Sequence, residues 1–185
     1  MQVTINANGK TVQAEISEGQ LKELGLVEQL KKLGLLEDKP RTGYEGREEC
    51  NNKKHYFVNT IDLVIEDENT VLFDQNRYDV GNYYSDKTIA ENNARADRLL
   101  RQLRQWQAQN DEPISISDWE NEGIIKYFIA YNYRSSLFEI GRCSRRREPN
   151  IIYFTTKDKV SKAVKNFRDE LEWYFTEYQQ RLDEE

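Results

Sequence analysis

Residues 82–104 read NYYSDKTIAENNARADRLLRQLR, and this stretch decides the fold. Its two tyrosines predict the end of a strand, and the hydroxyl of Ser85 is suited to cap the first N–H groups of a helix. At about 100° per residue, several of the positions that follow share one helical face: Ile89, Asn93, Ala96, Leu100 and Leu103. We therefore predict a strand followed by a long amphipathic helix with one face in the core.

The same order of elements occurs twice along the chain. Residues 55–110 and 113–185 each read as strand, strand, short strand and helix, with an apolar stretch at 70–73 in the first half. Thr155 stands 70 residues after Ser85, again between an aromatic strand and a helix. The pattern predicts an α+β fold with two similar antiparallel units. Common turn chemistry, rather than a duplication, is the alternative origin of the similarity.

The last helix carries a continuous apolar stripe, which predicts a single core-facing helix. Its members are Val160, Ala163, Val164, Phe167, Leu171, Tyr174, Phe175, Tyr178 and Leu182. Trp173 falls outside this stripe, so it has no obvious place in the core. We interpret Trp173 as an interface aromatic that contacts a partner or a second copy of the chain. Packing against the N-terminal module is the alternative.

Residues 1–38 predict a small module of a β-hairpin and short helices. Asn8-Gly9 separates two alternating apolar segments, which is a strong hairpin signal because both turn residues must accept positive φ. Ser17 and Gln20 have the spacing of a capping box. Two nearly identical Leu-rich segments follow, and each reads as a short helix that ends at a glycine.

The Leu-rich repeat allows two interpretations, a slipped duplication or a docking arm. The polar residues 39–54, with one Pro and two Gly, predict a linker. The main α+β domain is therefore expected over residues 55–185.

Composition restricts the chemistry. The 185 residues include 33 acidic and 27 basic side chains, one His and two Cys, with a net charge of −6. So few His and Cys disfavour a zinc site, and we predict no metal and no cofactor. No apolar run approaches the roughly 18 residues of a membrane span, and the N-terminal residues do not resemble a signal peptide. We expect a cytoplasmic protein with reduced thiols and no membrane partner.

The basic candidates for partner binding cluster late in the chain. Four arginines stand within six positions: Arg142, Arg145, Arg146 and Arg147. Guanidinium groups at this density can hold phosphates in bidentate fashion. Arg98 and Arg101, on the long helix, extend the set if the two groups share a surface. The alternative is a solvated hairpin whose arginines pair with acidic side chains of the same chain.

An acidic segment offers the opposite candidate surface. It contains Asp62, Glu66, Asp67, Glu68 and Asp74. A row of carboxylates can occupy a basic groove meant for nucleic acid. The alternative is a strand pair with charged edges, which discourages aggregation between sheets.

No catalytic constellation stands out. His55 has no recognisable partner in the sequence, and we interpret it as a surface or strand-edge residue. Cys143 lies between Arg142 and Ser144, where nearby cations could lower its pKa. No phosphate-binding loop or dinucleotide fingerprint occurs among the nine glycines. We therefore predict a protein that is not an enzyme.

Residues 76–104 resemble a segment of small, uncharacterised proteins from phages and prophages of Gram-positive bacteria. Those proteins often combine it with an N-terminal module like the one around Val3–Ile5 and with a late aromatic strand like Tyr153–Thr155 before a helix. The family has no established activity, so it carries over no catalytic residue. The resemblance implies a phage accessory protein that works in the bacterial host cytoplasm.

We therefore expect a phage protein without catalytic activity that binds a host protein or nucleoprotein. Accessory proteins of this kind often antagonise host defences, so an inhibitor of the anti-CRISPR type is the specific form of this hypothesis. Two alternatives stay open. One is a nucleic-acid-binding protein that uses the Arg142–Arg147 cluster, and the other is a structural or homo-oligomeric phage component.

Overall fold

The computed structural model describes residues 2–7, 10–15, 17, 19–20, 25–32, 41–45, 54–67 and 71–184. The chain divides into two compact units, Met1–Pro40 and Arg41–Glu185. We call them the N-terminal unit and the main unit. Among the described residues, no helix is both long and apolar enough to cross a membrane.

The N-terminal unit contains the predicted hairpin. Strand β1 (Gln2–Ala7) pairs antiparallel with β2 (Lys10–Glu15), and Ala7 lies opposite Lys10. This register leaves a two-residue connection, as an Asn-Gly turn requires. The turn residues themselves lie outside the described part of the chain.

The predicted capping box is confirmed. The backbone N–H of Ser17 donates to Gln20 Oε1 at 2.9 Å, and the N–H of Gln20 donates to Ser17 Oγ at 3.3 Å. The next helix in the unit is α2 (Val27–Lys32), which begins two residues after Gly25. Most of the Leu-rich repeat, and with it the docking arm, lies outside the described residues.

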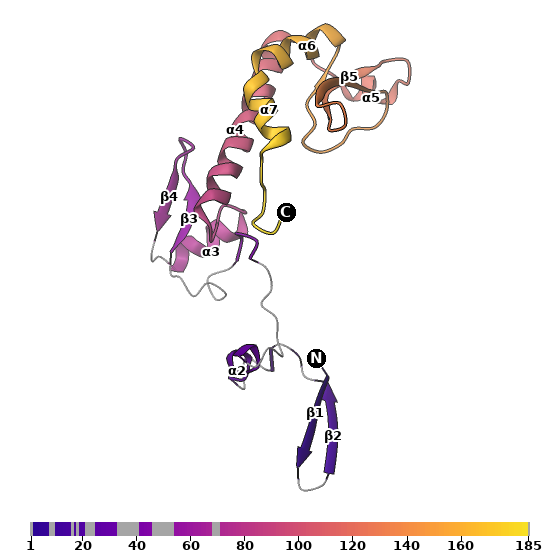
Figure 1. Cartoon of the computed structure of the whole chain (residues 1–185). Coiled ribbons are helices and arrows are strands. Elements are labelled where there is room, and N and C mark those ends of the chain that lie inside the picture. The colour runs from indigo at the N-terminus through magenta and orange to yellow at the C-terminus, as the bar shows by residue number, and fades with distance from the viewer. Residues whose placement is uncertain are drawn as a thin grey trace. The chain divides into compact units, whose positions relative to one another are not determined.

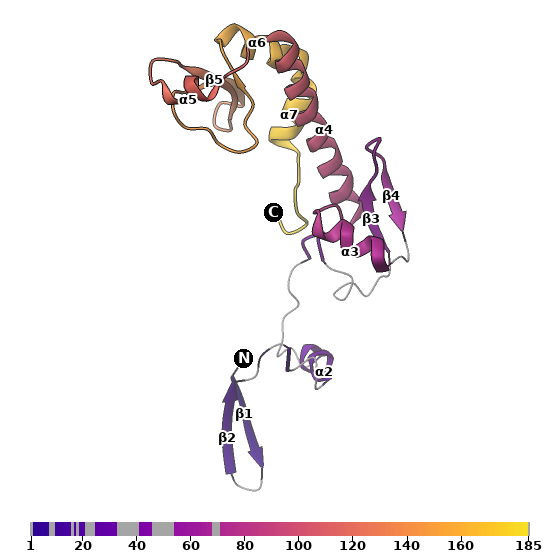
Figure 2. The same ribbon diagram turned by 180° about the vertical axis from the view of Figure 1, so that it is seen from behind.

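Helix α4 (Lys87–Asn110) is the long helix of the main unit. Figure 1 shows β3 (His55–Val58), β4 (Val64–Asp67) and α3 (Val71–Asp79) beside the N-terminal end of α4. The second group of strands lies near the other end of α4, and the reverse view in Figure 2 shows the same order. The strands of the two predicted halves thus lie near opposite ends of α4.

The second half begins with the short helix α5 (Ile116–Glu120). Strands β5 (Lys126–Asn132), β6 (Leu137–Cys143) and β7 (Tyr153–Phe154) then form an antiparallel sheet in the order β6-β5-β7. The first half is built similarly, because β3 pairs with β4 on one side and Tyr56 bridges to Tyr84 on the other. The predicted α+β class is confirmed.

Two local features differ from the strand-and-cap pattern of the sequence. Within the apolar stretch at 70–73, residues Val71–Phe73 begin helix α3, because a short apolar run does not distinguish a strand from a helix. The helix caps lie one residue later than expected: Asp86 accepts from the N–H of Ile89 at 3.1 Å, and Thr156 accepts from the N–H of Lys159 at 3.3 Å.

The predicted final helix is two helices. Helix α6 (Lys157–Asn166) ends at Phe167, whose φ and ψ of −116° and 24° leave the helical region, and α7 (Arg168–Thr176) follows. Figure 1 shows α7 running beside α4. Beyond α7 the chain continues to Leu182, whose N–H donates to the carbonyl of Thr42 at 3.0 Å.

Two apolar clusters hold the main unit together. One joins the C-terminal part of α4 to the second half, with Leu99, Phe154 and Val160 almost fully buried. The other joins the N-terminal part of α4 to the first half, with Ile89 and Ala90 fully buried beside Tyr84. Each large buried apolar side chain contributes roughly 1.5–3 kcal/mol relative to its exposed state, so α4 stabilises both halves.

The predicted linker needs a correction. Residues 41–45 belong to the main unit, because the carbonyl of Gly43 accepts from the N–H of Ser85 at 2.9 Å and Tyr44 packs against the first-half cluster. Lys54 lies directly before β3. Residues 46–53 lie outside the described residues.

Candidate functional site

The predicted acidic and basic surfaces meet at Asp62. This residue lies in the turn between β3 and β4 with a positive φ of 60°. Its Oδ1 atom is 2.6 Å from Arg101 Nη2, and its Oδ2 atom is 3.3 Å from Arg98 Nε. Both arginines of α4 are therefore engaged by an acidic side chain of the same chain.

The other acidic candidates do not form one surface. Glu66 is exposed on β4 and pairs with Lys54 at 2.6 Å between Oε1 and Nζ. Asp67 ends β4, and Glu68 lies outside the described residues. Asp74 is on α3 and only 5 % exposed, so its carboxylate does not face solvent.

Asp74 is instead part of a buried pair. Its Oδ1 atom lies 2.9 Å from His55 Nε2, and His55 is 2 % exposed. The imidazole ring stacks on Tyr83 with centroids 4.5 Å apart. The interpretation of His55 as a surface or strand-edge residue without a partner is wrong. This buried pair links β3 to α3.

Trp173 also has a place in the core. It is 8 % exposed, on α7. The guanidinium carbon of Arg95 lies 3.9 Å from its ring centroid, and Arg95 forms two hydrogen bonds to Glu170. The ring also packs 5.5 Å from that of Tyr178. Because these groups cover the indole, Trp173 is not the exposed interface aromatic that the stripe pattern predicts.

The late arginine cluster remains accessible. Arg142 is the penultimate residue of β6, and Arg145, Arg146 and Arg147 follow in the loop to β7; all four are exposed. We call residues 142–147 the arginine loop. Arg145 pairs with Glu122 at 2.7 Å. Among the described residues, no carboxylate forms an ion pair with Arg142, Arg146 or Arg147.

Buried polar contacts hold the arginine loop in position. Lys126 is 1 % exposed at the start of β5, and its Nζ atom donates to the carbonyls of Asp118 and, at 2.6 Å, Ser144. The hydroxyl of Tyr153 accepts from the N–H of Glu148 at 3.0 Å and donates to the carbonyl of Arg146 at 3.4 Å. The loop backbone is thus tied to the sheet on both sides of Arg145–Arg147.

An aromatic ring lies beside the arginine loop. Trp119 of α5 is 4.9 Å from Lys126 Nζ and 5.9 Å from the guanidinium carbon of Arg147, both measured from a ring centroid. Its ring meets that of Tyr153 edge to face at 4.8 Å. The sequence offered no signal for the role of Lys126, because a single lysine before an aromatic strand looks like a strand-end charge.

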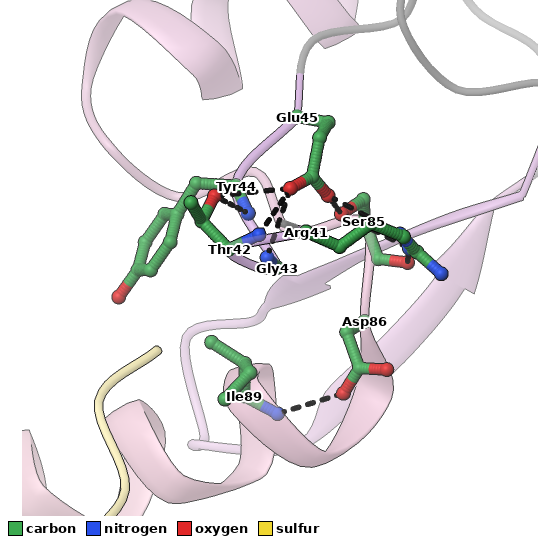
Figure 3. Close-up of polar contacts among 8 residues, drawn as sticks. All are labelled: Arg41, Thr42, Gly43, Tyr44, Glu45, Ser85, Asp86 and Ile89. Carbon is green, nitrogen blue, oxygen red and sulfur yellow. Dashed lines mark hydrogen bonds and ion pairs between the residues drawn. The ribbon is translucent and has the colours of Figure 1, made fainter. Parts of the chain in front are cut away.

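A second polar cluster, around Glu45, is structural. Figure 3 shows its carboxylate accepting hydrogen bonds from the backbone N–H groups of Thr42 and Gly43, from the Thr42 hydroxyl and from the Ser85 hydroxyl. Burial by itself raises the pKa of Glu45, but these hydrogen bonds outweigh it and lower the pKa to about 2. The carboxylate fixes the start of the main unit to the residue before the α4 cap.

The surroundings of Cys143 do not lower its pKa. Burial raises its pKa, and the nearby Lys126 only partly opposes that effect, so the sequence-based expectation of a lowered pKa is wrong. Cys50 lies outside the described residues. Within the described ranges, no three His, Cys, Asp or Glu side chains gather in a way that could hold a metal ion.

Comparisons of the chain with protein-family models, curated protein sequences and solved structures found no match. The arginine loop is therefore the candidate site on its own geometry. It is an exposed, positively charged surface that can form bidentate hydrogen bonds with carboxylates or phosphates.

Proposed function

We propose that this chain is a non-catalytic binding protein that contacts a macromolecule of a bacterial host through the arginine loop. One observation carries the proposal. Of the six arginines that the sequence marks for binding, Arg98 and Arg101 are occupied by Asp62, whereas Arg142, Arg146 and Arg147 form no ion pair with any described carboxylate. These three guanidinium groups can bind a partner without first giving up an intramolecular ion pair.

The hydrogen bonds that hold the loop backbone support the same proposal. Ordering a flexible loop on binding costs free energy, and arginine side chains on a fixed backbone avoid part of that cost. Lys126 and Tyr153 supply the fixation, because both hold carbonyl groups of residues 144–146 from the sheet. The arginine loop is therefore better suited to recognition than a free charged loop would be.

The phage-like segment at residues 76–104 supports a bacterial setting for the partner. The specific form of the proposal is an inhibitor of a host defence system, with a protein or nucleoprotein as its target. That segment includes Tyr84, Ile89 and Ala90 of the first-half cluster, and Leu99 and Leu103 of the other cluster. Its likeness to phage proteins thus concerns the scaffold, whereas the arginine loop supplies the proposed contact.

Affinity capture from a bacterial lysate, followed by mass spectrometry, tests the proposal. The full chain is compared with a variant that carries Arg142→Ala, Arg146→Ala and Arg147→Ala. The matched control removes three exposed cations elsewhere: Arg134→Ala, Lys162→Ala and Lys165→Ala. We expect the wild type and the control to capture the same specific partner and the arginine-loop variant to lose it. Equal capture by all three proteins would contradict the proposal.

Nucleic-acid binding is the second candidate, favoured by Trp119 beside Arg147. Aromatic rings and arginines together bind single strands by stacking and by phosphate contacts. A fluorescent single-stranded oligonucleotide should then bind more weakly as the salt concentration increases. The logarithm of the binding constant should fall linearly with the logarithm of the salt concentration, with a slope of about −0.7 per phosphate neutralised. Absence of binding at low salt, or an unchanged slope in the arginine-loop variant, would remove this candidate.

A further inference from the structure

Lys126 is a lysine in the interior of the main unit. It begins β5 and is only 1 % exposed. Its Nζ atom donates to the carbonyl of Asp118 in α5 and, at 2.6 Å, to the carbonyl of Ser144 in the arginine loop. These carbonyls are 8 and 18 positions from Lys126 in the sequence. One buried ammonium group thus joins α5 to the arginine loop.

The charge of this ammonium group is hydrogen-bonded but not neutralised. Among the described residues, no carboxylate forms an ion pair with Lys126. The carboxylate of Asp118 accepts instead from the backbone N–H and the hydroxyl of Ser115, each at 2.7 Å. These hydrogen bonds lower the pKa of Asp118, and Lys126 contributes least to that shift. A buried charge without an opposite charge destabilises a fold, so stability alone does not explain a lysine at this position.

The two elements that Lys126 joins carry the groups of the candidate site. Trp119 directly follows Asp118, and its ring centroid lies 4.9 Å from Lys126 Nζ and 5.9 Å from the guanidinium carbon of Arg147. The arginines at 145–147 directly follow Ser144. Each carbonyl that Lys126 holds therefore stands next to side chains that can reach a partner. Trp and Arg are the residue types that most often dominate binding energy at interfaces.

We propose that Lys126 is the positioning residue of a binding surface that comprises Trp119, Arg146 and Arg147. Its ammonium group fixes the indole ring and the guanidinium groups relative to one another before a partner binds, so less ordering is needed on binding. Departures from the most stable choice of residue are expected at functional sites. This inference rests on the proposed function. It adds Trp119 to the site as a contact and Lys126 as a residue that the partner does not touch.

Lys126→Met tests this role, because it removes the charge and keeps an unbranched apolar side chain. The free energy of unfolding, measured by chemical denaturation, should equal or exceed that of wild type. The amide of Glu148, which donates to the Tyr153 hydroxyl just after the arginine loop, should exchange with solvent at least tenfold faster. The amount of partner captured from the lysate should fall at least tenfold.

The matched control is Lys159→Met, which also removes a lysine that donates to a main-chain carbonyl, that of Asn110. It should change neither the exchange of the Glu148 amide nor the capture of the partner. Trp119→Leu is a second variant, and it removes the proposed aromatic contact while both carbonyls stay available to Lys126. It should lower capture without speeding the exchange of the Glu148 amide.

A Lys126→Met chain that unfolds more easily than wild type, or that does not fold, would show that the lysine stabilises the fold and would overturn the inference. Unchanged capture by Lys126→Met or by Trp119→Leu would also overturn it. If the arginine-loop variant loses the partner while both of these variants keep it, this inference fails and the proposed function stands. If the arginine-loop variant keeps the partner, the proposed function fails and this inference fails with it.

Discussion

His55 Nε2 lies 2.9 Å from Asp74 Oδ1, and both side chains are almost fully buried. The two residues are 19 positions apart in the sequence: His55 is the first residue of β3, and Asp74 lies in the first turn of α3. Arg77 reaches the same carboxylate at 3.5 Å and covers the Phe57 ring at 3.5 Å from its centroid. The pair and its neighbours therefore hold α3 against the β3–β4 hairpin.

Removing one member of this pair should be costly. Asp74→Ala leaves the imidazole of His55 buried without its carboxylate, and loss of one partner of a buried pair typically costs about 3 kcal/mol. Chemical denaturation at neutral pH measures the free energy of unfolding. Asp79→Ala, at an exposed residue of the same helix, should change it by less than about 0.5 kcal/mol. Equal effects of the two substitutions would show that the buried contact contributes nothing specific.

Glu45 should make the main unit sensitive to acid. Its folded-state pKa of about 2 lies below the ordinary value of 4.5, so the carboxylate stabilises the fold fully above pH 4.5. This stabilisation should be lost as the pH falls from 4.5 toward 2. We expect Glu45→Gln to cost on the order of 2 kcal/mol at pH 7 and much less near pH 2. Denaturation curves across this range test the prediction.

The control for Glu45 is Glu120→Gln, which removes an exposed carboxylate from α5. Its unfolding free energy should follow that of wild type at every pH. A constant difference between wild type and Glu45→Gln down to pH 2 would contradict the assigned role of the carboxylate.

Tyr84 should limit stability at alkaline pH. Burial raises its pKa to about 12, from 10. The folded state therefore favours the neutral phenol, and stability should fall as the pH rises from 10 toward 12. Tyr84→Phe keeps the ring and removes the ionisable hydroxyl. It should reduce the loss of unfolding free energy between pH 10 and pH 12 by on the order of 2 kcal/mol. Tyr133→Phe, at a residue 72 % exposed, should not flatten it.

Gly43 should not tolerate a side chain. Its φ is 90°, and a Cβ atom there would lie 2.8 Å from Cγ1 of the fully buried Ile89. Gly43→Ala combines backbone strain with overpacking, and we expect a loss of about 2–3 kcal/mol. Thermal or chemical unfolding measures it. Gly81→Ala also has a positive φ, of 72°, but meets no atom within 4 Å, so it isolates the backbone strain.

The two halves contain matching hydroxyl-to-carboxylate hydrogen bonds that no sequence pattern predicts. Ser85 donates its hydroxyl to Glu45, and Thr155 donates its hydroxyl to Asp111 at 2.5 Å. Each hydroxyl precedes a helix cap instead of serving as one. In each half, both the residue with this hydroxyl and the one after it are of types that cap helices well. A carboxylate from elsewhere in the chain accepts the hydroxyl of the first residue, and the second residue caps the helix.

The sequence by itself determined the elements whose signals are local. Alternation around Asn8-Gly9 specified the hairpin. The period of apolar residues after Asp86 specified α4 and part of its buried face: Ile89, Ala96 and Leu103 are buried as predicted, whereas Leu99 is buried in place of Leu100. The order of aromatic strands and helices was enough to predict an α+β fold with two similar halves. Backbone hydrogen bonds and side-chain periods act over a few residues, so these features are readable without a fold.

Tertiary structure alone decided which charged and aromatic side chains are available. Asp62 occupies Arg98 and Arg101, 36 and 39 positions away, and Asp74 is buried against His55. Arg95 covers Trp173 across two helices, whereas the arginine loop keeps three unpaired guanidinium groups among the described residues. Sequence periodicity does not identify the partner of a charged side chain or an indole ring, because such contacts depend on which elements the core brings together.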